Sequence, residues 1–244
     1  MHVSVELIPR DTETLLRDAA EVRSCFPLAD MINIPDLLRF PLRSWDAAAL
    51  VRPHFPNVIP HIRAIDIAPD APLPGVGQEG LEAVLVVQGD PPSDLRHLTY
   101  PNTTESIIRR YRAEAPHLSV YAAFDPYRRA PYREMEAIAR KKDAGAVGFF
   151  TQPIFDMRML DLCMNWLHGE NVFWGISPVV GPRSRSYWET TNHVIFPHDF
   201  EPTMEANIAF ARQMMGTVRT QGGNVYLMPL RVNLQRYLVP LCDV

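Results

Sequence analysis

The sequence predicts an α/β fold, a single (β/α)8 barrel of the TIM type with a reduced third helix, as one domain over residues 1–244. Three observations support this prediction. The length of 244 residues matches the usual size of such a barrel, about 250 residues. A hydrophobic content of 47% is enough to fill one core. Short apolar runs alternate with amphipathic segments along the whole chain, which favours a closed parallel barrel over an open sheet.

The expected strands are short apolar runs bounded by turn residues. They lie at residues 3–8, 30–34, 58–67, 83–87, 119–124, 147–151, 172–178 and 225–229. The expected helices lie at residues 12–24, 103–115, 132–144, 157–167 and 202–220, with a short helix around 45–50. Thr12, Thr103 and Ser44 are the residues expected to cap helix starts.

The third helix of the barrel is expected to be reduced or missing. Residues 68–77, which follow the third strand, read APDAPLPGVG and contain too many prolines for a full helix. We find no internal repeat and no interdomain linker, so a second domain is not expected.

Composition restricts the class of function. The 24 Lys and Arg against 28 Asp and Glu give a net charge of −4, which argues against a nucleic-acid partner. No apolar run approaches the roughly 20 residues of a membrane span, so we expect no membrane partner and a cytoplasmic protein. Cys25, Cys163 and Cys242 lack the spacing of a zinc site and are expected to be packing residues, with no bound metal.

A polar pair closes the sixth expected strand. Thr151 and Gln152 follow an apolar run that begins at Ala146, and the carboxyl ends of barrel strands are where ligand contacts collect. The uncharged amide of Gln152 therefore indicates a ligand contact. The alternative is a polar strand end that bonds its own loop.

Two carboxylates are candidates for acid chemistry. Glu6 lies inside an apolar strand, where burial would raise its pKa toward that of a useful general acid. Asp90 follows Gly89 at the end of the fourth strand, where it would project into the mouth of the barrel. The alternatives are a structural carboxylate at Glu6 and an ordinary turn residue at Asp90.

Three further side chains could face the barrel mouth. His61 and Asp66 lie in the third expected strand, although a single strand histidine is more often packed than catalytic. Arg231 follows the eighth strand and could pair with an anionic ligand or close the barrel by a salt bridge.

Six segments together resemble the methylenetetrahydrofolate reductase family. They are VSVELIP at 3–9, QGDPP at 88–92, RKKDAGA at 140–146, TQ at 151–152, GISP at 175–178 and VYLMPLR at 225–231. The resemblance implies a (β/α)8 barrel, in agreement with the strand pattern. It also implies reduction of 5,10-methylenetetrahydrofolate to 5-methyltetrahydrofolate, with hydride passing from NADH or NADPH through FAD.

The resemblance implies roles for the candidate residues. Glu6 matches the acid that protonates the folate and opens its methylene bridge, and Asp90 matches the acid near flavin and pterin. Gln152 and Arg231 match folate contacts, and Ser4 faces the same site. The flavin-binding surface matches His61, Gln88, Gly89, Ala123, Phe124, Arg128, Arg140 and Lys141. For Lys141, a solvated helix end is the alternative.

The departures from the family pattern fall mainly on the cofactor side. Gln88 stands where the family has arginine, Arg128 where it has histidine, and Ala137 where it has asparagine. We therefore expect weak binding of FAD, with partial or empty occupancy in the isolated protein. Two alternatives stay open: a flavin-free or weakly flavin-binding folate oxidoreductase of a demethylation pathway, and a non-catalytic folate-binding subunit. A homo-oligomer is expected, with NADH or NADPH as the electron donor.

Overall fold

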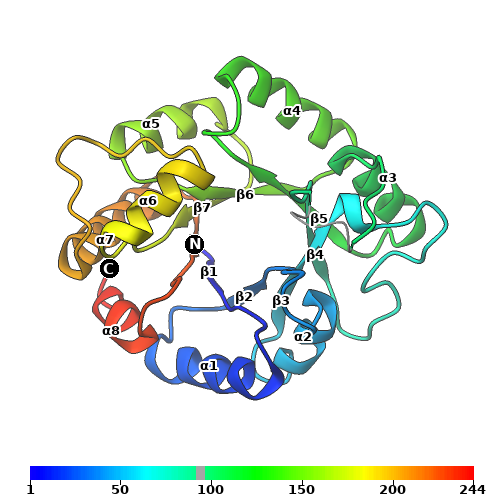
Figure 1. Ribbon diagram of the computed structural model, residues 1–244, viewed down its shortest axis with the longest axis horizontal. Coiled ribbons are helices and arrows are strands. Elements are labelled where there is room, and N and C mark those ends of the chain that lie inside the picture. Colours follow the sequence, from blue (N-terminus) through cyan, green and yellow to red (C-terminus); the bar gives the residue numbers. More distant parts are fainter. Residues whose placement is uncertain (92–96) are drawn as a thin grey trace.

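Eight parallel strands close into a barrel in sequence order (Figure 1). The computed structural model describes residues 1–91 and 97–244. Every strand pairs with its sequence neighbour, and β1 pairs with β8 to close the barrel. The strands are β1 (Val3–Glu6), β2 (Met31–Ile34), β3 (Asn57–Arg63), β4 (Ala83–Val87), β5 (Ser119–Phe124), β6 (Gly148–Pro153), β7 (Val172–Ile176) and β8 (Asn224–Leu227). The predicted fold class is confirmed.

Helices form a ring around the barrel (Figure 1). They are α1 (Thr12–Cys25), α2 (Ser44–Val51), α3 (Thr104–Glu114), α4 (Pro131–Asp143), α5 (Met157–Trp166), α6 (Pro182–Thr191), α7 (Met204–Thr220) and α8 (Leu234–Leu238). Thr103 caps α3 as predicted, because its hydroxyl accepts from Ser106 N. The predictions for Thr12 and Ser44 were wrong: Asp11 caps α1, and Ser44 is the first residue of α2, where its hydroxyl donates to His61 O.

The helix between β3 and β4 is reduced to a single 3-10 turn, η1 (Ala64–Asp66). This confirms the prediction from the proline-rich stretch. The following loop is held by α3, because the Tyr111 hydroxyl donates to Pro74 O at 2.7 Å. Leu73 and Leu81 of this loop are buried. The loop therefore covers the flank of the barrel that a helix would otherwise cover.

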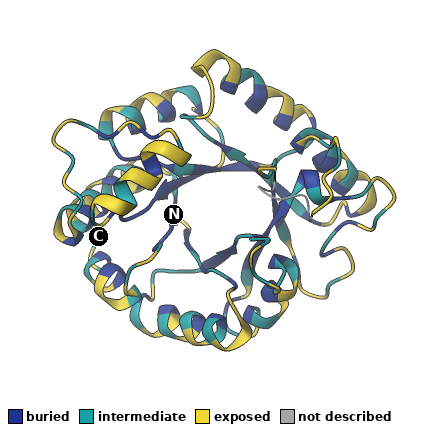
Figure 2. Ribbon diagram, viewed as in Figure 1, coloured by how far each residue is buried: buried dark blue, intermediate teal, exposed yellow. Residues whose placement is uncertain are grey.

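Side chains of each strand point alternately toward the helices and toward the barrel interior. The buried residues lie on the strands and on the inner faces of the helices (Figure 2). The larger cluster fills the space between strands and helices. A smaller cluster fills the barrel interior with Met31, Ile59, Leu85, Phe150, Phe173, Tyr226 and Met228. The rings of Phe150 and Phe173 stack there at 4.2 Å. This packing leaves the carboxyl ends of the strands as the place for a site.

Candidate functional site

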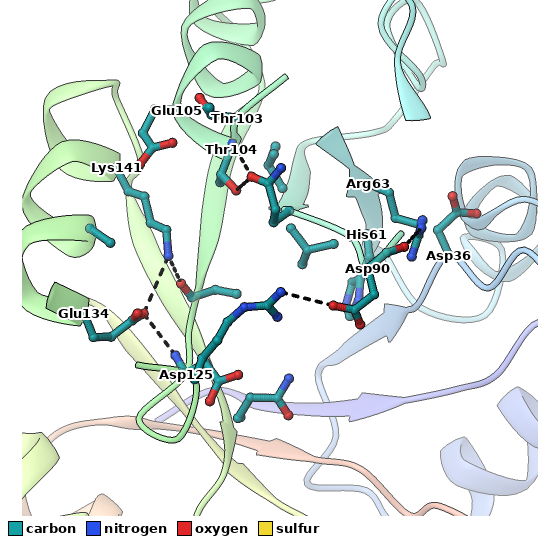
Figure 3. A pocket seen from close by; sticks show the side chains of 18 of the residues that line it. Asp36, His61, Arg63, Asp90, Thr103, Thr104, Glu105, Asp125, Glu134 and Lys141 are labelled. Atoms are coloured by element: carbon teal, nitrogen blue, oxygen red, sulfur yellow. Dashed lines mark hydrogen bonds and ion pairs between the residues drawn. The ribbon is translucent and has the colours of Figure 1, made fainter. Parts of the chain in front are cut away.

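A cleft of about 760 Å³ opens at the carboxyl ends of β2 to β6. Its walls come from the loops after these strands and from α3 and α4 (Figure 3). Nine of the residues predicted for the site line it: His61, Gln88, Gly89, Asp90, Ala123, Arg128 and Gln152, with Arg140 and Lys141 from α4. The structure therefore brings most of the predicted cofactor surface together.

The cleft carries mixed charge, and four of its cations form ion pairs with its acids. Six basic side chains line it: Arg63, Arg109, Arg128, Arg129, Arg140 and Lys141. Five acids oppose them: Asp36, Asp90, Glu105, Asp125 and Glu134. Arg128 pairs with Asp90 at 3.1 Å and Arg140 with Glu105 at 3.4 Å. An anionic ligand would have to compete with these carboxylates.

Lys141 reaches the cleft although it lies late in α4. Its ammonium donates to Ala123 O at 2.6 Å and lies 3.9 Å from Glu134 Oε1 (Figure 3). Burial lowers the pKa of Lys141, while Glu134 and Glu105 oppose that effect. The alternative of a solvated helix end is therefore wrong.

Glu134 forms the buried acidic centre of this wall. Its side chain is only 3% exposed, and its Oε2 pairs with Arg129 at 3.0 Å. Its Oε1 also accepts a bond from the Asp125 backbone N–H at 3.3 Å (Figure 3). Sequence reasoning missed Glu134 and Asp125. The available signal was the position of Glu134 in α4, seven residues and so two helical turns before Lys141.

Gln88 has a structural task in the cleft. Its amide nitrogen donates to Asn102 O at 2.9 Å, and its oxygen accepts from Thr104 N at 3.0 Å. These bonds tie the end of β4 to the start of α3. Both the nitrogen and the oxygen of the Gln88 amide therefore have protein partners, so neither is free to bind a cofactor without losing one of these bonds.

Gly89 and Asp90 form the exposed lip of the cleft. Gly89 has φ +80°, and a Cβ there would lie 3.1 Å from Ile65 Cγ1 and 3.2 Å from Arg63 Cζ. Glycine is therefore needed for packing against the protein itself. The Asp90 side chain is 80% exposed, and its backbone O accepts from Arg63 at 2.7 Å. Pro92, the last residue of the 88–92 motif, lies outside the described residues.

Two predicted contacts are corrected by burial. Phe124 is fully buried in the cluster between strands and helices, because β5 alternates and Phe124 lies on the face opposite Tyr121 and Ala123. Ser4 is also fully buried, and its hydroxyl donates to Asn33 Oδ1 at 2.7 Å. Neither side chain can touch a ligand in this conformation.

Glu6 lies in a second, smaller cavity of about 260 Å³ at the ends of β1 and β8. The Tyr226 hydroxyl donates to its carboxylate Oε2. Burial raises the pKa of Glu6 from 4.5 to about 7, and the bond from Tyr226 opposes that rise. A carboxyl with this pKa can give or take a proton near neutral pH. Sequence reasoning predicted Glu6 and missed Tyr226.

Arg231 lines the same small cavity as Glu6. Its backbone is left-handed, with φ +57°, and its guanidinium lies 5.7 Å from the Tyr187 ring centre. The structure thus separates the predicted folate contacts, since Gln152 and Asp90 line the large cleft. Between the two cavities lie the rings of Tyr226, which bonds Glu6, and His61, which lines the large cleft; their centres are 6.5 Å apart.

His61 is a neutral member of this interior. Its Nε2 lies 3.1 Å from Asn33 Nδ2, and burial lowers its pKa to about 3. Asp66 does not lie in the third strand as predicted, because β3 ends at Arg63; Asp66 belongs to η1 and pairs with Arg63 at 2.7 Å. His61 can therefore accept or donate a hydrogen bond at the cleft but carries no charge at neutral pH.

In residues 1–91 and 97–244, no group of three or more His, Cys, Asp or Glu side chains is placed to hold a metal ion. The three cysteines are free thiols. No helix within these ranges combines the length and apolar character needed to cross a membrane.

Comparison by sequence finds no protein-family model and no curated protein that matches the chain. Comparison by structure finds a protein from Clostridium thermocellum that binds two copies of 5-methyl-5,6,7,8-tetrahydrofolic acid. The two share 13% identity over 99% of this chain and 94% of the other, with a TM-score of 0.68.

Two similar barrels belong to other chemistries. A 2,3-dimethylmalate lyase of the PEP mutase/isocitrate lyase superfamily shares 15% identity over 91% of this chain and 83% of its own, with a TM-score of 0.52. An oxaloacetate acetylhydrolase shares 11% identity over 94% and 75%, with a TM-score of 0.57. At these identities, the likeness establishes the barrel fold alone.

Proposed function

We propose that this protein binds a reduced folate at the carboxyl ends of its strands and acts as a methylenetetrahydrofolate reductase. The observation that carries the proposal is Glu6, a half-buried carboxyl at the mouth of the barrel whose Oε2 accepts a hydrogen bond from the Tyr226 hydroxyl and whose pKa is raised by burial to about 7. The tetrahydrofolate bound by the similar barrel supports the substrate class. The lyase and the acetylhydrolase among the similar barrels share the fold without suggesting this substrate.

In this proposal, protonated Glu6 gives its proton to a nitrogen of the methylene bridge. The carbon–nitrogen bond then breaks with its electron pair on that nitrogen, and a cationic iminium remains on the folate. Hydride addition to the iminium carbon gives the methyl group. A folate that extends from the small cavity into the large cleft would meet Gln152, which would orient it by amide hydrogen bonds, and Asp90, which would stabilise the cation electrostatically.

The donors of the large cleft fit FAD in chemical type. Arg128, Arg140 and Lys141 would hold the diphosphate, and the neutral His61 would face the ring system. When bound, FAD supplies hydride transfer between NADH or NADPH and the folate. The protein must first release these cations from Asp90, Glu105 and Glu134, which favours weak flavin binding.

The test compares wild type with Glu6→Gln in two assays. Glu6→Gln should lower the reduction of 5,10-methylenetetrahydrofolate by about 10²–10⁴-fold, because the amide cannot deliver the proton. Electron transfer from the nicotinamide to added FAD should be retained, because it needs no proton on the folate. Equal loss in both assays would reject the role of Glu6.

A second candidate is a folate-binding protein without a tightly held flavin. The paired cations of the cleft, and Ala137 in its wall, favour it. The visible spectrum of the purified protein separates the two candidates. Flavin absorbance, or turnover that depends on added FAD, supports the reductase. Calorimetric binding of 5-methyltetrahydrofolate without absorbance or turnover supports the second candidate.

A further inference from the structure

The Tyr226 side chain is fixed inside the barrel beside Glu6. Only 3% of Tyr226 is exposed, and its ring lies edge-on to Phe150 with 5.2 Å between the ring centres. Its hydroxyl donates to Glu6 Oε2 from the neighbouring strand. The packed ring therefore aims one hydroxyl at one carboxylate oxygen.

The other groups around Glu6 do not provide an equivalent bond. Asn33 on β2 is opposite Glu6 in register, but its amide contacts Ser4 and His61. His61 on β3 is neutral. The remaining charged side chains of the cavity come from the loop after β1, from α1 and from the loop after β8: Arg10, Arg17, Asp18, Glu21 and Arg231. The influences on the pKa of Glu6 are burial, which raises it, and the Tyr226 bond, which lowers it.

We propose that Tyr226 is the positioning residue of the Glu6 acid: its hydroxyl orients the carboxyl and stabilises the carboxylate that is left when the proton moves to the folate. This inference rests on the proposed reductase function. In the reducing direction, the proton passes from Glu6 to the bridge nitrogen and the carboxylate keeps the bond from Tyr226. In the oxidising direction, the proton returns to Glu6. One carboxyl can thus serve both directions.

Removal of the hydroxyl should make Glu6 hold its proton more tightly. In Tyr226→Phe the carboxylate loses a hydrogen bond to a charged group, so the titration midpoint of Glu6 should rise by about one pH unit. The upper limb of the pH–rate profile should move by the same amount. We expect kcat for folate reduction to fall about tenfold with KM little changed, because the missing bond acts on proton release.

Infrared difference spectroscopy measures the midpoint without any turnover. The carbonyl stretch of protonated Glu6 is the band that Glu6→Gln removes, and its intensity is followed from pH 5 to pH 9. Tyr121→Phe is the matched control: Tyr121 is another tyrosine in contact with the interior cluster, and its ring lies 5.3 Å from that of Phe150. Its loss should leave the Glu6 midpoint in place. An unchanged midpoint in Tyr226→Phe, or an equal shift in Tyr121→Phe, overturns the proposal.

A second variant keeps the test informative if Tyr226→Phe does not fold. Incorporation of 3-fluorotyrosine at position 226 retains the ring and makes the hydroxyl a stronger donor, so the Glu6 midpoint should move down. A rise or no change contradicts the proposal. The proposed function fails separately: normal infrared shifts without folate turnover under any cofactor condition would reject the reductase, and with it the catalytic role of the pair.

Discussion

The two cavities at the carboxyl ends of the strands use charge in opposite ways. The large cleft holds many charged groups, and its cations are shared with carboxylates such as Asp90, Glu105 and Glu134. The small cavity also has charged walls, but its Glu6 carboxyl is half-buried and accepts its hydrogen bond from a neutral donor, Tyr226. An ion pair keeps charge in place and suits ligand binding, whereas burial beside a neutral donor shifts a pKa and suits proton transfer. We expect substitutions in the large cleft to alter ligand affinity and substitutions in the small cavity to alter pH dependence.

Lys141→Met should have the largest effect on stability. Lys141 is buried, and its loss leaves Ala123 O without its donor and Glu134 with Arg129 as its other ion-pair partner. We expect a loss of about 2–3 kcal/mol in the free energy of unfolding. Urea unfolding measures this value.

Lys142→Met is the matched control for this prediction. Lys142 pairs with Glu170 outside the cleft, and nearly half of its side chain is exposed. Its loss should change the free energy of unfolding by no more than about 0.5 kcal/mol. Similar losses in both variants would mean that Lys141 is an ordinary surface lysine.

Glu6→Gln should change the pH dependence of stability. The folded pKa of about 7 lies above the ordinary value of 4.5, so the folded state binds more protons than the unfolded state between these values. Wild-type stability should therefore fall by about 2 kcal/mol as pH rises from 5 to 8, and Glu6→Gln should remove most of that fall.

Urea titrations at pH 5 and pH 8 test this prediction. Glu21→Gln, in the wall of the same cavity, controls for the removal of a negative charge. The prediction is contradicted if Glu21→Gln flattens the pH dependence as much as Glu6→Gln does.

The sequence was enough to predict the barrel, because strand and helix periodicity are local properties. The proline-rich stretch at 68–77 likewise predicted the reduction of the third helix to η1. The same kind of local pattern could have excluded Phe124 from the predicted flavin-binding residues. A period of two places Ala123 and Phe124 on opposite faces of β5, so only one of them can face the cleft.

The partners within the site were less predictable than the residues themselves. The bond between Tyr226 and Glu6 joins the first and last strands, 220 positions apart, and depends on how the barrel closes. The pair of Arg128 with Asp90 depends on the conformation of two loops. Apolar periodicity contains no information about either contact. The sequence therefore indicated where polar groups collect but not how they neutralise one another.

Gln152→Ala should weaken folate binding without altering pH dependence. Gln152 lines the large cleft, and each lost amide hydrogen bond contributes about 0.5–1.5 kcal/mol. We expect the affinity for 5-methyltetrahydrofolate to fall by about two- to tenfold in calorimetric titrations. Gln221→Ala, at the end of α7, is the control and should bind like wild type. Unchanged affinity in a folded Gln152→Ala protein would support the alternative of a structural strand end.

The smallest effect is expected from replacing either member of the exposed ion pair between Arg128 and Asp90. Arg128 and Asp90 are 48% and 80% exposed, so their ion pair should contribute less than about 1 kcal/mol to stability. Substitution of Arg128 and substitution of Asp90 should change the affinity of the purified apo protein for FAD in opposite directions. Arg128→Ala removes a cation and should weaken binding about fivefold, whereas Asp90→Asn frees that cation and should strengthen binding by a similar factor at low salt. Fluorescence titration at two salt concentrations measures both changes. If both variants weaken binding equally, Asp90 contacts the ligand directly rather than competing with it for Arg128.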